Sequence, residues 1–245
     1  MAIPRRYSHR TANVGFTYQV LPGRGSGTAI PAVLSMTDKT LVIFTKAPIG
    51  GQVKTRLAAT VGDEQALLAH IELVESTLAR LSEMADAKVV LCLSEAHPKG
   101  REWCRRFNAE LCFQAQGGLG ERMAASIEHQ FTAPTGAADR VVLIGADCPE
   151  IDQNYVISAF AALNKQAAVF GPTEDGGYGL VGVRRSDFAS VQPIFGDLEW
   201  GSDRVMKQTR EILAANGCPW LELPEIWDID DAADWQRYQL WCQLR

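Results

Sequence analysis

The chain has 245 residues, of which 47% are hydrophobic and 22% charged, and its formal net charge is −5. This length suits one large α/β domain or two small ones, and the acidic balance argues against a general nucleic-acid binder. The apolar runs all fall short of the ~18 residues that predict a membrane span, so we expect no membrane span.

The amino-terminal segment differs in charge from the rest of the chain. Residues 1–36 contain four arginines and no acidic residue. A targeting segment is one interpretation of this composition. The other is a non-native extension, because Met36 stands where a strand-first domain would begin. We expect the second, with residues 1–36 disordered or non-native and residues 37–245 forming a single domain.

Six cysteines are scattered along the chain without a C-x-x-C pair. Several lie in or beside apolar runs, where a free cysteine usually serves as a small core residue. This pattern favours a reduced, cytoplasmic protein over a disulfide framework or a zinc module.

Strand-like and helix-like segments alternate after residue 37. Short apolar runs predict strands at residues 41–44, 88–93, 110–115, 140–145, 167–171, 178–183 and 220–223. Amphipathic spacing predicts helices at residues 63–83, 98–107, 120–131, 152–163, 202–215 and 231–240. This alternation predicts right-handed βαβ crossovers and a three-layer α/β/α domain with a mostly parallel sheet. Ligands of such sheets bind at the carboxyl ends of the strands.

A basic loop follows the first predicted strand. Gly50 and Gly51 allow backbone amides to approach an anion, and Lys46, Lys54 and Arg56 offer positive charge to phosphate oxygens. The loop is neither a Walker loop nor a dinucleotide fingerprint. A phosphate-binding loop is therefore one interpretation, and a solvated basic turn is the other.

An aspartate follows the fourth predicted strand directly. Asp147 stands between Gly145 and Pro149, in a position that points its carboxylate into the ligand crevice. Carboxylate oxygens suit Mg²⁺ or Mn²⁺, which bind one or two carboxylates together with substrate phosphates. Asp147 could instead cap the next helix, but Asp152 is better placed to do so. We therefore predict that Asp147 is a metal ligand.

A glycine-rich loop lies between the next two predicted strands. Gly176 and Gly177 follow Asp175 and precede Tyr178. Such a density of glycine is costly unless the backbone bends tightly or approaches a ligand. A substrate-binding loop is favoured over a plain hairpin, with Asp175 placed to orient or deprotonate an acceptor hydroxyl and Tyr178 to contact the acceptor.

Two alternating aspartates precede the last predicted helix. Asp228 and Asp230 stand at a predicted strand end. Asp230 is a candidate second metal ligand. Capping of the helix by Asp230 or Asp231 explains the same pattern without a metal.

Four motifs in this order resemble a known family. They are Phe44-Thr-Lys-Ala-Pro48 with Val53-Lys-Thr-Arg-Leu57, Gly145-Ala-Asp-Cys-Pro149, Gly171-Pro-Thr-Glu-Asp-Gly-Gly-Tyr178 and Asp228-Ile-Asp230. Together they resemble the bacterial radical-SAM/selenodomain-associated glycosyltransferases, which are similar in fold to nucleotidyltransferases such as molybdenum cofactor guanylyltransferase. The resemblance implies a GT-A-like nucleotide-diphospho-sugar transferase fold. It also implies Mg²⁺ or Mn²⁺ at Asp147 and Asp230, with phosphates at the first loop.

Three functions stay open at this point. The family resemblance favours transfer from a nucleotide-sugar to an acceptor. The three-cation first loop suits a nucleoside triphosphate, with nucleotidyl transfer and release of pyrophosphate. A third alternative is a non-catalytic nucleotide-binding or partner protein, in which late tryptophans form a homodimer surface; core packing is the simpler account of them. These tryptophans are Trp220, Trp227, Trp235 and Trp241.

Overall fold

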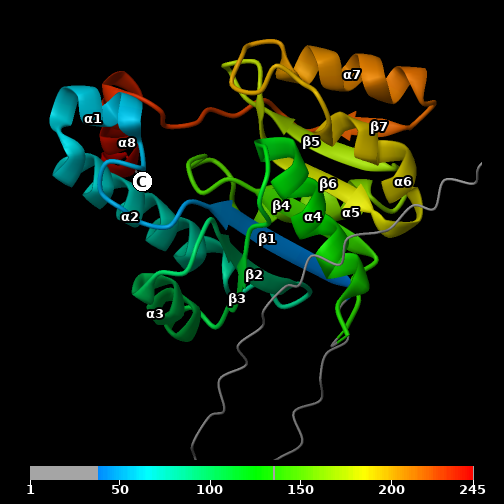
Figure 1. The fold of residues 1–245 in the computed structure, drawn as a ribbon, viewed down its shortest axis with the longest axis horizontal. Coiled ribbons are helices and arrows are strands. Elements are labelled where there is room, and N and C mark those ends of the chain that lie inside the picture. Colours follow the sequence, from blue (N-terminus) through cyan, green and yellow to red (C-terminus); the bar gives the residue numbers. More distant parts are fainter. Residues whose placement is uncertain (1–37, 135, 245) are drawn as a thin grey trace, which may run out of the picture. The chain divides into compact units, whose positions relative to one another are not determined.

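The computed structural model describes residues 38–134 and 136–244 (Figure 1). The predicted extension at residues 1–36 lies outside the described residues, and the division of the chain into domains stays a prediction. The strands of the described part are β1 (Lys39–Thr45), β2 (Lys88–Leu93), β3 (Glu110–Phe113), β4 (Arg140–Ile144), β5 (Ala168–Pro172), β6 (Tyr178–Arg184) and β7 (Trp220–Glu222). The helices are α1 (Thr55–Val61), α2 (Asp63–Leu81), α3 (Pro98–Arg106), α4 (Leu119–Thr132), α5 (Gln153–Ala162), α6 (Phe188–Val191), α7 (Val205–Ala215) and α8 (Ala232–Gln243), with 3₁₀ turns at Arg185–Asp187 and Gln192–Phe195.

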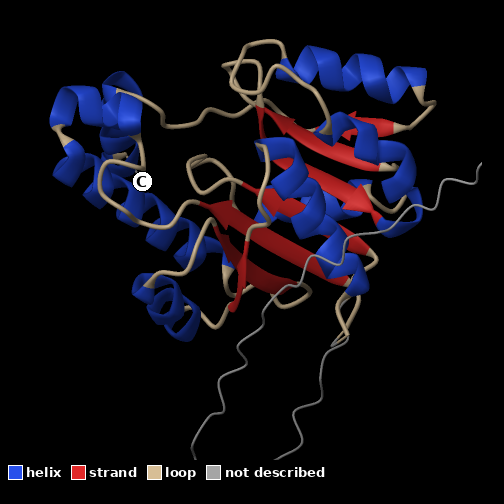
Figure 2. Cartoon of the chain, in the orientation of Figure 1, coloured by secondary structure: helices blue, strands red, loops and turns tan. Residues whose placement is uncertain are grey.

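All of these strands belong to one sheet, in the order β3-β2-β1-β4-β6-β5-β7 (Figure 2). β1 pairs in parallel with β2 and β4, and β2 with β3. β6 is antiparallel to both of its neighbours, and β7 is parallel to β5. The sheet is therefore mostly parallel, which confirms the predicted fold class.

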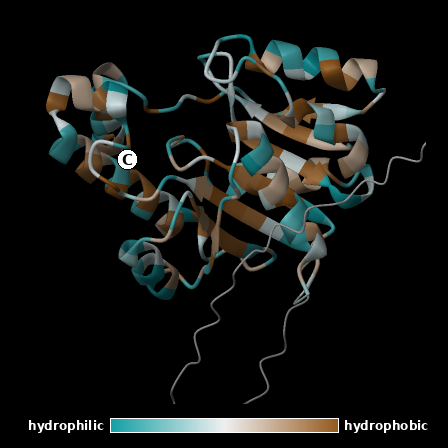
Figure 3. Ribbon diagram, viewed as in Figure 1, coloured by the Kyte–Doolittle hydropathy of each residue, from teal (hydrophilic) through white to brown (hydrophobic). Residues whose placement is uncertain are grey.

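The two faces of the sheet are covered by different helices. Leu41 and Ile43 of β1 pack with buried residues of α2, α3 and α5, whereas Val42 between them packs with buried residues of α4, the 188–195 turn and α7. Figure 3 shows the hydrophobic strands between the layers of helices. Parallel strands covered on both faces read as continuous apolar runs, which is why the sequence pattern located them.

Helices α1 and α8 pack on α2 beside the sheet. Trp235 of α8 contacts the cluster formed by Leu57 of α1 with Ala66 and Ala69 of α2. Trp235 and Trp241 also pack against a second cluster, which contains Leu73, Trp227, Ile229 and Tyr238. These late tryptophans thus take part in intramolecular packing, as the simpler interpretation expects.

Some predicted boundaries are wrong. The helix predicted from residue 202 begins at Val205, because Ser202 closes a turn in which its Oγ accepts from Arg204 N. The strand predicted to reach residue 115 ends at Phe113. Helix α1 is missing from the prediction altogether.

None of the helices in the described part has both the length and the apolar character that a bilayer crossing requires.

Candidate functional site

The site lies where β1 and β4 end, and a backbone contact joins the segment after β4 to the 228–230 segment. The amide of Ile229 donates to the carbonyl of Asp147 at 3.1 Å. This bond holds the 228–230 segment beside the residues that follow β4. A side chain at position 145 would meet Asp147 Oδ1 at 2.6 Å, so Gly145 leaves the space that the Asp147 carboxylate occupies.

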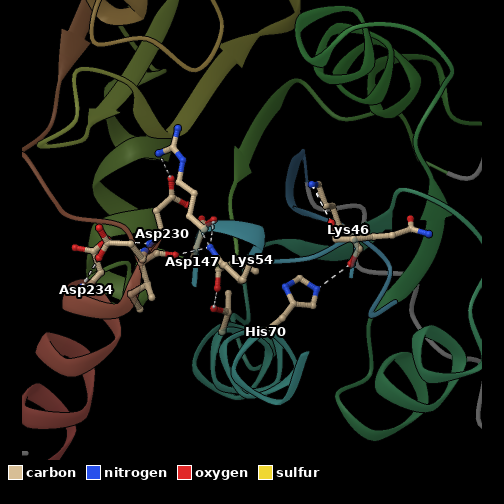
Figure 4. A network of polar contacts seen from close by, with 12 residues as sticks. Lys46, Lys54, His70, Asp147, Asp230 and Asp234 are labelled. Atoms are coloured by element: carbon tan, nitrogen blue, oxygen red, sulfur yellow. Dashed lines mark hydrogen bonds and ion pairs between the residues drawn. The ribbon is translucent and has the colours of Figure 1, made fainter. Parts of the chain in front are cut away.

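Lys54 lies between the two predicted metal ligands (Figure 4). Its Nζ donates to Asp147 Oδ2 at 2.9 Å and to the carbonyl of Ile229 at 2.5 Å, and it lies 3.7 Å from Asp230 Oδ1. Its side chain is only 8% exposed. Its backbone is left-handed, with φ of 45° and ψ of 48°, where non-glycine residues are uncommon. These contacts place the ammonium group between the two carboxylates.

Lys54 and Asp147 keep opposite charges. Burial by itself lowers the pKa of Lys54, but Asp147, together with Asp230 and Asp228, outweighs it and raises that pKa above its usual value. Burial likewise opposes ionisation of Asp147, yet Lys54 holds the pKa of Asp147 below its usual value. Since each charge stabilises the other, the pair stays ionised at neutral pH.

Asp230 and Asp231 divide two tasks that the sequence could not assign. Asp231 caps α8, since its Oδ1 accepts from the amides of Ala233 and Asp234. Asp230 instead turns its carboxylate to the cations, with Oδ2 3.1 Å from Arg56 Nη1. Asp230 is therefore available to a cation without loss of the helix cap.

Asp228 is partly buried close to the other carboxylates. Burial, with Asp147, Asp175 and Asp230 nearby, raises the pKa of Asp228 to about 7. This carboxylate was recognised in the sequence only as a neighbour of Asp230. Alternation along an extended segment turns both side chains the same way, and that signal could have placed Asp228 in the site.

A cavity of about 480 Å³ lies on one side of Asp147, and we call it the basic cavity. Four cationic side chains line it, together with Asp147 and Asp230. The cations are Lys46, Lys54, Arg56 and Arg122. Lys46 Nζ also donates to the carbonyl of Gln52 at 3.2 Å, which spans the loop after β1. Gly50 and Gly51 lie in this loop but outside the residues that line the cavity.

Sequence reasoning missed Arg122 and Gln114 in this cavity. Gln114 Nε2 donates to the carbonyls of Thr45 and Cys92 at 2.9 and 3.2 Å, and its Oε1 accepts from Arg122 Nη1 at 3.2 Å. Arg122 Nε is buried and has no hydrogen-bond partner in the described part of the chain. The predicted strand runs to residue 115, so the prediction places Gln114 inside it. In the structure β3 ends at Phe113, and Gln114 is the first residue after the strand.

His70 forms a hydrogen bond from helix α2 to the loop after β1. It is buried on α2, and its Nε2–H donates to the carbonyl of Lys46 at 3.1 Å. Burial lowers the pKa of His70, so the ring is neutral at physiological pH.

A second cavity of about 280 Å³ lies on the other side of Asp147, and we call it the acidic cavity. Three carboxylates line it, from Asp147, Asp175 and Asp228, together with Gly177 and Tyr178. The residues that the two cavities share are Phe44, Leu119, Asp147 and Gly201. Asp147 thus stands in the common wall.

The turn between β5 and β6 presents Asp175 to the acidic cavity. Asp175 Oδ1 accepts from Thr173 Oγ1 at 2.5 Å and from the amide of Gly177 at 3.0 Å, which closes the turn. Gly176 has φ of +84° and packs against Asp203, and it is absent from the lining. Gly176 therefore shapes the turn, whereas Gly177 and Tyr178 face the cavity.

No group of three or more His, Cys, Asp or Glu side chains in residues 38–134 and 136–244 is arranged to hold a metal ion. Asp147 and Asp230 nevertheless converge on one cation, the Lys54 ammonium. A pair of carboxylates is the protein share of a site that Mg²⁺ completes with substrate phosphates. The residues present fit such a site and do not fit a metal held by protein alone.

Residues 77–202, just over half of the chain, match a family described as an uncharacterized protein conserved in bacteria (DUF2064). The chain belongs to this family. The matched segment contains Asp147, Asp175 and Arg122, whereas Lys54 and Asp230 lie outside it. Comparison with curated proteins finds no match.

Solved structures share the fold. A protein from Desulfovibrio desulfuricans G20, described as a nucleotide-diphospho-sugar transferase, is 29% identical with a TM-score of 0.71 over 80% of this chain and 83% of its own. The 4-diphosphocytidyl-2C-methyl-D-erythritol synthase of Anaerococcus prevotii DSM 20548 is 10% identical with a TM-score of 0.58, over 85% and 98%. A cytidylyltransferase from Leptospira borgpetersenii serovar Hardjo-bovis is 14% identical with a TM-score of 0.56, over 83% and 85%. The fold is that of nucleotide-diphospho-sugar transferases.

Proposed function

We propose that this protein is a divalent-metal-dependent transferase that moves a sugar from a nucleotide-sugar to an acceptor. The observation that carries the proposal is the place of Asp147, in the wall between the basic and the acidic cavity. A nucleotide diphosphate in the first cavity and an acceptor in the second would meet at this carboxylate. The 29% identical structure described as a nucleotide-diphospho-sugar transferase supports the same class.

The basic cavity suits the phosphates of the donor. Arg56 and Arg122 present guanidinium groups that match phosphate oxygens in pairs, and Lys46 adds a point charge. These groups are held before the substrate arrives, so they would stabilise charge on the departing diphosphate without reorganisation of solvent.

Asp147 and Asp230 would hold the metal with the help of donor phosphates. Mg²⁺ or Mn²⁺ supplies a Lewis acid that offsets charge on phosphate oxygens. Lys54 occupies the point between the two carboxylates in this structure. We infer that Lys54 moves onto a phosphate when a metal and a nucleotide bind together.

The transfer step needs an acceptor hydroxyl beside Asp175. The hydroxyl oxygen would bond to the anomeric carbon of the sugar while the bond from that carbon to the phosphate oxygen breaks. The nucleoside diphosphate leaves with the electron pair, and the hydroxyl proton goes to the Asp175 carboxylate. Asp175 keeps its position through Thr173 and Gly177 during this exchange.

Nucleotidyl transfer is the second candidate, and the four cations of the basic cavity favour it, because they suit a triphosphate. An acceptor oxygen would then bond to the α-phosphorus, while the bond to the β-phosphate bridge breaks and pyrophosphate leaves. The cytidylyltransferases of the same fold belong to this class. The association with radical-SAM and selenodomain proteins stays a prediction.

Calorimetry with Mn²⁺ and a panel of nucleoside di- and triphosphates and nucleotide-sugars tests the proposal. We expect metal-dependent binding that Asp147→Asn weakens at least tenfold, while the matched change Asp86→Asn, at an exposed turn before β2, leaves it unchanged. Equal binding by Asp147→Asn contradicts the assigned site. Release of nucleoside diphosphate then indicates sugar transfer, and release of pyrophosphate indicates nucleotidyl transfer.

A further inference from the structure

The two cavities that meet at Asp147 differ sharply in charge. The lining of the acidic cavity contains three aspartates and no lysine, arginine or histidine. The basic cavity, which shares a wall with it, contains four cationic side chains. A negatively charged group would therefore be attracted to the basic cavity and repelled from the acidic one.

The walls of the acidic cavity are apolar and aromatic. Its aromatic residues are Phe44, Tyr178 and Trp200, and its aliphatic ones include Leu119, Met123 and Val205. Tyr178 and Trp200 meet edge to face, with ring centroids 6.3 Å apart, and Phe170 supports Tyr178 from the core at 5.4 Å. Rigid rings arranged in this way favour a flat, apolar ligand body.

One carboxylate oxygen of this cavity is left for a ligand. Asp175 Oδ1 is used by its own turn, and Oδ2 makes no hydrogen bond in the described part of the chain. The Tyr178 hydroxyl is buried and has no hydrogen-bond partner among the described residues. That hydroxyl is enclosed by protein, so Asp175 Oδ2 is the polar atom of these two residues that a ligand in the cavity can reach.

We propose that the acidic cavity binds an acceptor with an aromatic or flat apolar body, a hydroxyl or amino group, and no anionic group. The body packs against the rings of Trp200 and Tyr178, and the hydroxyl or amino group donates to Asp175. Acceptors that carry a phosphate or carboxylate are disfavoured by Asp175 and Asp228, which have no cationic partner in the lining. The inference rests on the proposed function only in naming this ligand an acceptor.

Three phenyl-substituted probes of similar size and different charge test the proposal. They are 2-phenylethanol, 2-phenylethylamine and 3-phenylpropionate, and their binding to the full chain is measured by ligand-observed NMR and tryptophan fluorescence in EDTA. We expect the alcohol and the amine to bind at least tenfold more tightly than the acid. We expect Trp200→Ala to weaken binding of the alcohol and the amine at least fivefold.

The charge preference is traced with Asp175→Asn. This change keeps the oxygen that accepts from Thr173 and Gly177 but removes the charge, so the ratio of amine to acid affinity should fall at least threefold. Asp86→Asn should leave the ratio unchanged. Preferential binding of the acid, equal binding of all three probes, or no binding overturns the proposal. Nucleotide binding, measured separately on the same preparations, shows whether the proposed function fails independently.

Discussion

Lys54 Nζ and Asp147 Oδ2 lie 2.9 Å apart although 93 residues separate them in the chain. The pair joins the loop after β1 to the residue that follows β4, and it brings the ammonium within 3.7 Å of Asp230. A lysine thus supplies the positive charge at the point where two carboxylates converge. Breaking such a partly buried pair on one side leaves uncompensated charge on the other.

Removal of the Lys54 ammonium should strengthen metal binding in the absence of nucleotide. In Lys54→Met the carboxylates of Asp147 and Asp230 lose their internal counter-ion, so we expect Mn²⁺ to bind at least fivefold more tightly by calorimetry. Without metal, the variant should be destabilised by about 1–3 kcal/mol in urea unfolding, and Mn²⁺ should restore part of the loss.

The matched control for this change is Lys165→Met. Lys165 lies in an exposed turn at the amino-terminal end of β5, whereas the site lies at the carboxyl ends of β1 and β4. It should leave both the Mn²⁺ affinity and the stability unchanged. Weaker Mn²⁺ binding by Lys54→Met would show that the lysine does not compete with the metal for the two carboxylates.

Ionisation of Asp228 should destabilise the metal-free protein. The pKa of Asp228 is raised from its ordinary value of 3.8 to about 7, so the folded state binds the proton more tightly than the unfolded state does. The free energy of unfolding therefore falls as the pH rises between these two values. In EDTA, Asp228→Asn should therefore be more stable than the wild type by roughly 1–2 kcal/mol at about pH 8, with solvent screening reducing the full effect. Near pH 4 the two proteins should be equally stable. A stabilisation that does not change with pH in urea unfolding contradicts this account.

The sequence pattern reveals the sheet more fully than the site. Leu41 and Ile43 lie in an apolar run that only a buried strand explains, so the strands could be predicted. Helix α1 could not, because it begins after Lys54, whose left-handed backbone is held by contacts with Asp147 and Ile229 from distant segments. Local helix propensity does not depend on such tertiary contacts, so it could not predict where α1 begins.

The site residues show the same limit. Asp147 could be singled out because it follows a strand, whereas Arg122 lies on a helix whose pattern shows only which face is buried. Its role in the basic cavity depends on Gln114, which bonds the ends of two other strands. The opposite charges of the two cavities depend on chain segments that meet only in the folded state.

Glu75 should stabilise the protein in the opposite pH direction from Asp228. It accepts from Trp103 Nε1 at 2.9 Å, from Arg106 Nη1 at 3.1 Å and from Lys99 Nζ at 3.3 Å, and these contacts lower its pKa. A depressed carboxylate pKa gives stability that is present above its unfolded value and is lost as pH falls through the folded value.

Glu75→Gln should therefore cost about 1 kcal/mol at neutral pH and almost nothing at about pH 3. Glu102→Gln serves as the control, since Glu102 contacts Lys99 at the surface, is 55% exposed, and should have little effect at any pH. Thermal unfolding across this pH range measures both variants. An equal loss at both pH values would mean that shape, not charge, is what Glu75 contributes.

Gly176 and Gly62 offer a matched test of how the Asp175 turn is built. Both have φ of +84°, but a side chain at position 176 would lie 2.2 Å from the backbone oxygen of Asp203, whereas position 62 has no atom within 4 Å. Gly62 has ψ of 160°, a backbone region adopted almost only by glycine, so Gly62→Ala adds backbone strain of about 1–3 kcal/mol without a clash. Gly176→Ala adds a clash with backbone that cannot rotate away, so its total cost should be about 2–4 kcal/mol.

Because the amide of Met206 donates to the Gly176 carbonyl, the displacement caused by Gly176→Ala should also move the wall of the acidic cavity. We expect Gly176→Ala, but not Gly62→Ala, to weaken 2-phenylethanol binding at least fivefold at a temperature where both variants are folded by circular dichroism. Equal binding by the two variants would mean that the turn tolerates the displacement without loss of the cavity.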